Sequence, residues 1–189
     1  WADAWANAQW IRAAKNSIII GVFSTVVATV LGTLAALGLA RPEMPFRRTI
    51  MAILLSPMIV PIIITATGLF FFYSATGLSG TYVGLILAHA VLGIPFVIIT
   101  VTATLIGFDQ SLNRAAASLG ANPRTTFFRV TMPLILPGVI AGAVLAFAKA
   151  MGEFGATITF VSNIPGQTQT LPSAIYSFLQ VPGGEAPAA

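Results

Sequence analysis

Long apolar stretches alternate with shorter polar ones along this chain, and the alternation predicts a helical membrane protein. The apolar stretches cover about residues 16–40, 49–74, 82–107 and 134–162. At about 1.5 Å of rise per residue, each is long enough as a helix to cross a hydrocarbon core about 30 Å thick. We therefore expect an all-α, polytopic bundle of about four transmembrane helices.

The composition agrees with a bilayer environment. Hydrophobic residues make up 57% of the 189 residues and charged residues only 7%, whereas an average soluble domain carries about 25% charged residues. The chain has no cysteine and one histidine, which excludes disulfides and argues against a metal site built by the protein. The nine basic residues are spread over several loops, so no nucleic-acid-binding surface is expected.

The charged loops orient the predicted bundle. Segment 41–48 (RPEMPFRR) holds three arginines, and the central loop 109–133 has a net positive charge, whereas the loop at 75–81 has no charge. The positive-inside tendency places the two basic loops in the cytoplasm. The tail, 163–189, then lies outside, as does segment 1–15. The three tryptophans of segment 1–15 predict an interfacial helix on the outer surface of the membrane, with a frayed chain end as the alternative.

Small side chains recur at four-residue spacing in the first and last apolar stretches. The first stretch carries threonines and the last carries glycines and alanines: Thr25, Thr29 and Thr33, and Gly138, Gly142, Ala146 and Ala150. Such columns let membrane helices approach one another closely. We expect both stretches to be packed inside the bundle.

Prolines interrupt the second stretch. Pro57 and Pro61 each remove a backbone donor, so the carbonyls of Ile53 and Pro57 lose their usual helical partners. A bent helix beside a translocation pathway and a plain packing kink both fit this pattern. In the third stretch, the single His89 fits either a hydrogen-bonded packing residue or a proton relay.

Two opposite charges lie four residues apart in the last stretch, on one face of the predicted helix. Lys149 and Glu153 can neutralise each other, and charges inside a membrane usually face the protein interior or a water-filled path. A residue pair that lines or gates the pathway and a purely structural ion pair both remain open. The candidate pathway or gate residues are Pro57, Pro61, Lys149, Glu153, Phe154 and Gly155.

The central polar segment, 113–133 (NRAAASLGANPRTTFFRVTMP), is too long for a plain turn between two spans. It starts with helix-forming alanines, turns at about 120–123, and is expected to stop at Pro133. Its alanine pair, glycine and final proline have the spacing of a motif. The segment resembles the E-A-A-x3-G-x9-I-x-L-P cytoplasmic loop of binding-protein-dependent ABC importer permeases, with Arg114 at the glutamate position.

This resemblance implies that the loop forms two short coupling helices that dock on an ATP-binding subunit. Small residues would permit close approach, and the glycine would permit the turn. The residues expected in this coupling loop are Arg114, Ala115, Ala116, Gly120, Ala121, Pro123, Arg124 and Pro133. The chain lacks the G-x-x-x-x-G-K-S/T motif that cradles phosphates, so no enzyme activity and no cofactor of its own are expected.

The family resemblance also implies partners and a location. ABC ATPase subunits on the cytoplasmic side would bind ATP and magnesium, an extracytoplasmic binding protein would deliver the substrate, and a second permease subunit, identical or different, would complete the pathway. The expected location is the bacterial inner membrane. Family members usually have one more span before residue 1 and another after the tail, so the chain is also expected to be a fragment.

The resemblance points to two substrates. Residues 1 to about 147 resemble polyamine-class permeases, whereas about 145–189, with the run GEFGATITFVSNIPG, resemble molybdate permeases. We favour a molybdate-type oxyanion because that run is the longest specific one, with a polyamine as the alternative and a chimeric chain as one explanation. A transporter that works without an ATPase, through Lys149, Glu153 and His89, is a further alternative. An intramembrane enzyme is disfavoured because no H-E-x-x-H motif or paired aspartate set is present.

Overall fold

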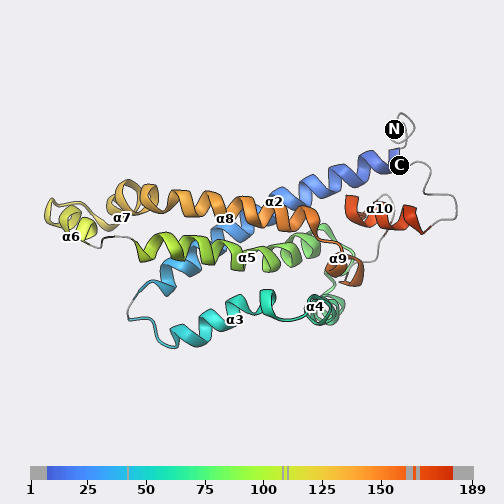
Figure 1. Cartoon of the computed structure of the whole chain (residues 1–189), viewed down its shortest axis with the longest axis horizontal. Coiled ribbons are helices and arrows are strands. Elements are labelled where there is room, and N and C mark those ends of the chain that lie inside the picture. Colours follow the sequence, from blue (N-terminus) through green and yellow to red (C-terminus); the bar gives the residue numbers. More distant parts are fainter. Residues whose placement is uncertain are drawn as a thin grey trace.

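Three long helices lie side by side in the computed structural model: α2 (Ala8–Leu39), α5 (Tyr82–Ile106) and α8 (Met132–Gly152) (Figure 1). The shorter elements are α3 (Arg47–Ile59), α4 (Ile62–Thr76), α6 (Ser111–Ser118), α7 (Pro123–Thr126), the π-helical turn η1 (Phe127–Thr131), α9 (Gly155–Phe160) and α10 (Leu171–Leu179). The structure describes residues 8–41, 43–107, 109, 111–160, 164 and 167–180, and these contain no strand. The expected all-α fold class is confirmed.

Three helical segments are long and apolar enough to cross a membrane within the part of the chain that is described. They are α2, α5 and the continuous helix Pro123–Gly152, and the bent pair α3–α4 passes the same test as one unit. The set corresponds to the four expected apolar stretches. Helices α2 and α5 run in the same direction, and α8 runs in the opposite direction beside them (Figure 1). As a result, α6 and α7 lie at one end of the bundle and α10 lies at the other.

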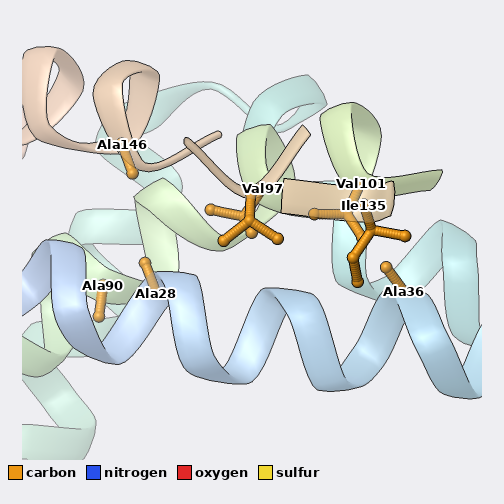
Figure 2. Close-up of a cluster of buried hydrophobic side chains, with 8 residues drawn as sticks. Ala28, Ala36, Ala90, Val97, Val101, Ile135 and Ala146 are labelled. Atoms are coloured by element: carbon orange, nitrogen blue, oxygen red, sulfur yellow. The ribbon is translucent and has the colours of Figure 1, made fainter. Parts of the chain in front are cut away.

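Small residues hold the three long helices together, and Gly142 and Ala146 among them belong to the column predicted in the last apolar stretch. A Cβ atom on Gly32 would lie 2.7 Å from Val97 Cβ, and one on Gly142 would lie 2.8 Å from Val97 Cα. Figure 2 shows the buried cluster between the helices, to which α2 contributes Ala28 and Ala36, α5 contributes Ala90, Val97 and Val101, and α8 contributes Ile135 and Ala146. The backbones therefore approach too closely for larger side chains.

Gly142→Ala is expected to lower the free energy of unfolding by about 1–2 kcal/mol, because the added methyl group meets the Val97 backbone, which cannot rotate away. Gly68→Ala on α4 is the matched control, since a Cβ there meets nothing within 4 Å and alanine favours a helix. Thermal unfolding in detergent micelles measures both. Equal stability of the two variants would contradict close packing at Gly142.

The first helix begins earlier than expected. Residues 8–15, which the sequence placed in a separate interfacial segment, form the first turns of α2, because no glycine or proline interrupts them. The Trp10 ring packs against Phe178 of α10, with 5.5 Å between ring centroids. The rest of the tryptophan-rich segment, residues 1–7, lies outside the described residues.

The second apolar stretch forms two helices with a sharp bend between them. Helices α3 and α4 meet at an angle of 105°, where Val60 is extended and Pro61 precedes the first turn of α4. A residue before proline is pushed toward extended backbone, which explains the break at this point. The Ile53 carbonyl, which lacks a partner because of Pro57, accepts a hydrogen bond of 2.7 Å from the Ser56 hydroxyl.

The last apolar stretch differs from the expected continuous span, 134–162, at both ends. Helix α8 ends at Gly152, Glu153 is extended, and the chain becomes helical again at Gly155, because glycines on both sides of Glu153 weaken the helix. At the other end, the helix is continuous with α7, from Pro123 onward. The helix passes through Pro133 directly after the π-helical turn η1, where the Met132 N–H bonds to the Phe127 carbonyl.

Candidate functional site

The break after α8 holds the buried ion pair that the spacing of Lys149 and Glu153 predicted. Lys149 Nζ contacts Glu153 Oε2, and the other carboxylate oxygen accepts a hydrogen bond of 2.9 Å from the Ala156 N–H. The Glu153 side chain is only 4% exposed, whereas that of Lys149 is 33% exposed. Glu153 is thus both the counter-ion of Lys149 and the cap of the helix that follows the break.

A buried histidine joins this break to α5. His89 Nδ1 lies 2.8 Å from the Leu85 carbonyl oxygen, which can only accept, so this nitrogen carries a proton. His89 Nε2 lies 3.2 Å from the Thr157 hydroxyl, which is itself 3.3 Å from the Glu153 carbonyl. The geometry is that of a hydrogen-bonded packing residue, and a relay role stays a prediction. Thr157 was not selected from the sequence, because nothing local indicates its contact with a residue 68 positions away.

Open space and an aromatic contact border the same break. A Cβ atom on Gly152 or Gly155 would meet nothing within 4 Å. The Phe154 ring packs on Tyr176 of α10, with 4.7 Å between centroids. The residues that follow Glu153 are therefore held from one side by α10, while the glycines leave room beside the ion pair.

The prolines of the second stretch do not join the ion pair. Pro57 lies inside α3 and Pro61 at the start of α4, and no hydrogen bond connects either of them to Lys149 or Glu153 within the described residues. Their bend instead turns α4 against α9, where Ala66 and Ala156 are buried in one apolar cluster. The bend between α3 and α4 is therefore connected to the break at Glu153 through the contact of α4 with α9.

A polar clamp at the α10 end of the bundle was not foreseen from the sequence. Asn16 Nδ2 donates to the backbone carbonyls of Gln167 and Gln169 at 2.9 Å each, and the Tyr82 hydroxyl donates to Asn16 Oδ1 at 2.7 Å. The Leu171 N–H donates to the Ser17 hydroxyl at 2.7 Å. The clamp fixes the start of α10 on α2, but its partners are about 150 residues apart in sequence, beyond the reach of pattern analysis.

The central loop forms a helix–turn–helix of α6 and α7, with the turn where the sequence predicted it; the expected second short helix is not separate, because α7 continues through η1 into α8. Helix α6 ends where Gly120 adopts a φ of 81°, and the Ala121 N–H bonds back to the Ala116 carbonyl at 3.0 Å. This pair of features is the Schellman motif, which favours glycine at the left-handed position. The Asn122 side chain then accepts from the Thr125 N–H at 2.8 Å, and Pro123 occupies the first turn of α7.

The start of α6 is set by an acidic side chain. The Asp109 carboxylate accepts hydrogen bonds from the Ser111 hydroxyl at 2.7 Å and from the Ser111 N–H at 2.8 Å. These bonds favour the ionised form and hold the pKa of Asp109 below its usual value. These bonds hold the first residue of α6 against the loop that precedes it.

The residues expected in the coupling loop are available to a partner. Arg114, Ala115, Gly120, Pro123, Arg124 and Pro133 are exposed, and Ala116 and Ala121 are half-buried. The sequence did not single out Leu119, which is 89% exposed beside the glycine turn, or Phe128, which is 67% exposed. Exposed apolar side chains beside arginines are typical of a surface that binds another protein. This geometry is compatible with the docking role, which stays a prediction.

Comparisons with known proteins extend over most of the chain. The family model described as "Binding-protein-dependent transport system inner membrane component" matches residues 11–182. The molybdenum transport system permease protein ModB of Haemophilus influenzae is 38% identical over 93% of this chain and 82% of its own length. This one relative therefore covers both parts of the chain that the sequence had likened to different permeases.

Two further similarities are more limited. The ModB protein of Escherichia coli K12 is 55% identical over 106 residues, which are 56% of this chain and 46% of that protein, so the match spans about half of that relative. A bacterial ABC transporter involved in the import of the acidic polysaccharide alginate has a TM-score of 0.75 at 21% identity, over 99% of this chain and 66% of its own, and shows the fold. The chain belongs to the family of binding-protein-dependent transport system inner membrane components and is a multi-pass membrane protein.

Proposed function

We propose that this chain is the membrane-spanning subunit of an ABC importer for a molybdate-type oxyanion. The observation that carries the proposal is the 38% identity with a molybdenum transport permease over 93% of the chain. In this function the chain forms part of the substrate pathway and transmits the motion of a partner ATPase. ATP and magnesium are bound by that partner and not by this chain.

The unequal burial of the ion pair supports an anionic substrate. Lys149 and Glu153 cancel in net charge, but the carboxylate is enclosed while one-third of the lysine side chain is exposed beside the break. An anion that passes this point meets the ammonium group before the carboxylate, whereas a polyamine would meet the repelling charge. The pathway role of Phe154 and Gly155 follows from their place in the same break, and Pro57 and Pro61 contribute by bending the span that packs against it.

The coupling role is assigned to α6 and α7. ATPase subunits would bind the exposed turn around Gly120, and Arg114 and Arg124 would meet acidic groups of that partner. An extracytoplasmic binding protein would dock at the opposite end, where the clamp holds the start of α10. A second permease subunit would complete the pathway.

Reconstitution into proteoliposomes with candidate ATPase subunits and a binding protein tests the function. Molybdate-loaded binding protein is expected to stimulate ATP hydrolysis several-fold, and spermidine-loaded binding protein is expected to have no effect. Sulfate, another tetrahedral dianion, is the control for selectivity within oxyanions. Stimulation by spermidine alone would contradict the substrate class, and uptake without any ATPase would favour the ion-coupled alternative.

A further inference from the structure

A large cavity opens at the cytoplasmic end of the bundle, away from the ion pair. Its volume is about 1270 Å³, and it lies between the end of α2, the loop that follows, the end of α5 and the central loop. Leu34, Leu37 and Leu105 form part of an apolar wall, whereas Arg41 and Glu43 line the loop side. The cavity therefore combines an apolar part, continuous with the spans, with charged groups at the level of the membrane surface.

A second cavity lies at the start of α3, directly after the same loop. Its volume is about 440 Å³, and its lining consists of Arg47, Arg48, Met51 and Ala52 at the start of α3. Each of the three arginines of segment 41–48 thus borders a cavity that also has apolar lining. All three are exposed, and in the portion of the chain that the structure covers none of them forms an ion pair.

We propose that these cavities bind the headgroups of anionic phospholipids from the cytoplasmic leaflet. Guanidinium groups bind phosphate through paired hydrogen bonds, and basic pockets between spans on the cytoplasmic side suit anionic headgroups. The apolar walls accommodate the first part of an acyl chain, which a free phosphate ion does not have. Glu43 adds one negative charge to the larger cavity, so a phospholipid with a single phosphate meets Arg41 beside this carboxylate.

A second copy of the chain fits this surface less well. In a symmetric contact through this face, each copy would present segment 41–48, with three arginines against one glutamate, to the same segment. Such a contact would bring like charges together without a compensating acid. A lipid phosphate supplies the missing negative charge.

The larger cavity also gives the bound lipid a contact with the central loop. Asn113 of α6 and Thr131 of η1 line it, and the Thr131 hydroxyl donates to Asn113 Oδ1 at 3.2 Å. A headgroup in this cavity lies against both α6 and η1. Lipid binding would stabilise the position of α6 relative to α8, and this consequence holds whether or not the transported substrate is an oxyanion.

Native mass spectrometry of the purified full chain, after exchange into mixed micelles with phosphatidylglycerol or phosphatidylcholine, tests the proposal. Wild type is expected to retain phosphatidylglycerol preferentially. Arg41→Gln should reduce that retention about fivefold, the factor expected for one basic residue at a membrane surface. The double variant Arg47→Gln/Arg48→Gln should reduce it further, and Arg41→Lys should keep most of it because the charge remains.

Arg124→Gln is the matched control, since this exposed arginine of α7 lines neither cavity. It should leave lipid retention unchanged, and size-exclusion profiles should be equal for all variants. The proposal is overturned if phosphatidylcholine is retained equally well, or if Arg124→Gln removes as much lipid as Arg41→Gln. It is also overturned if inorganic phosphate displaces the lipid fully, or if the chain dimerises through this face and retains no lipid.

Discussion

Replacing Lys149 with methionine is expected to lower the free energy of unfolding by about 3–5 kcal/mol, the range for removal of one partner from a buried ion pair. Glu153 then stays buried with the Ala156 N–H as its remaining hydrogen-bond donor among the contacts described. Glu153→Gln is expected to cost less, because the amide oxygen can still accept from Ala156 and the one-third exposed lysine can turn its ammonium group toward water. Thermal unfolding in detergent micelles measures this asymmetry.

The double variant Lys149→Met/Glu153→Gln distinguishes the loss of the ion pair from the effect of changing either side chain alone. It should recover most of the loss caused by Lys149→Met, since no uncompensated charge remains. Lys15→Met, at an exposed position on α2, is the matched lysine control and should change stability by less than about 0.5 kcal/mol. If Lys149→Met is no more harmful than Lys15→Met, the carboxylate is not held in a buried environment by its lysine.

The contacts that follow from local spacing were predictable from the sequence. Lys149 and Glu153 are four residues apart, and one helical turn brings them together whatever the rest of the fold does. The small residues of α8 likewise face one direction by spacing alone. The turn after α6 needs a left-handed residue followed by a cap, and the letters G-A-N-P at 120–123 supply both.

The contacts between distant segments were not predictable in the same way. Thr157 with His89, and Asn16 with the backbone at Gln167, depend on how α5, α9 and the tail pack around α2. The bend at Pro57 and Pro61 was expected. Its angle of 105° was not, because it accompanies the packing of α4 on α9, which is distant in sequence.

The sign of the proposed substrate's charge also could not be predicted from local spacing. A lysine and a glutamate in one turn have no net charge, so the sequence favoured neither an anion nor a cation at this point. Burial differs between the two side chains only because the chain leaves its helical path at Glu153 and encloses the carboxylate. The proposed preference for an anion therefore rests on the break in the helix and not on the residue types.

Gly120→Asp is expected to weaken association with the partner ATPase by about tenfold or more while leaving the chain folded. Aspartate tolerates the left-handed backbone better than most residues, and a Cβ at this position meets nothing within 4 Å. The new carboxylate would instead lie in the surface proposed to dock, where it must be desolvated against a partner, and a cost of about 1.4 kcal/mol already gives a tenfold loss. A pull-down with titrated candidate ATPase subunits measures the effect.

Gly77→Asp provides the matched control at the opposite end of the bundle. Gly77 has a φ of 73°, close to the 81° of Gly120, and equally open space around its Cβ, but it follows α4 on the side without basic loops. The same substitution there imposes the same backbone strain and adds the same charge away from the proposed docking surface. Gly120→Asn keeps the turn without the charge and should bind more tightly than Gly120→Asp. If Gly120→Asp binds like wild type, or if Gly77→Asp weakens association as much, the turn between α6 and α7 is not where the ATPase docks, and another cytoplasmic segment must transmit its motion.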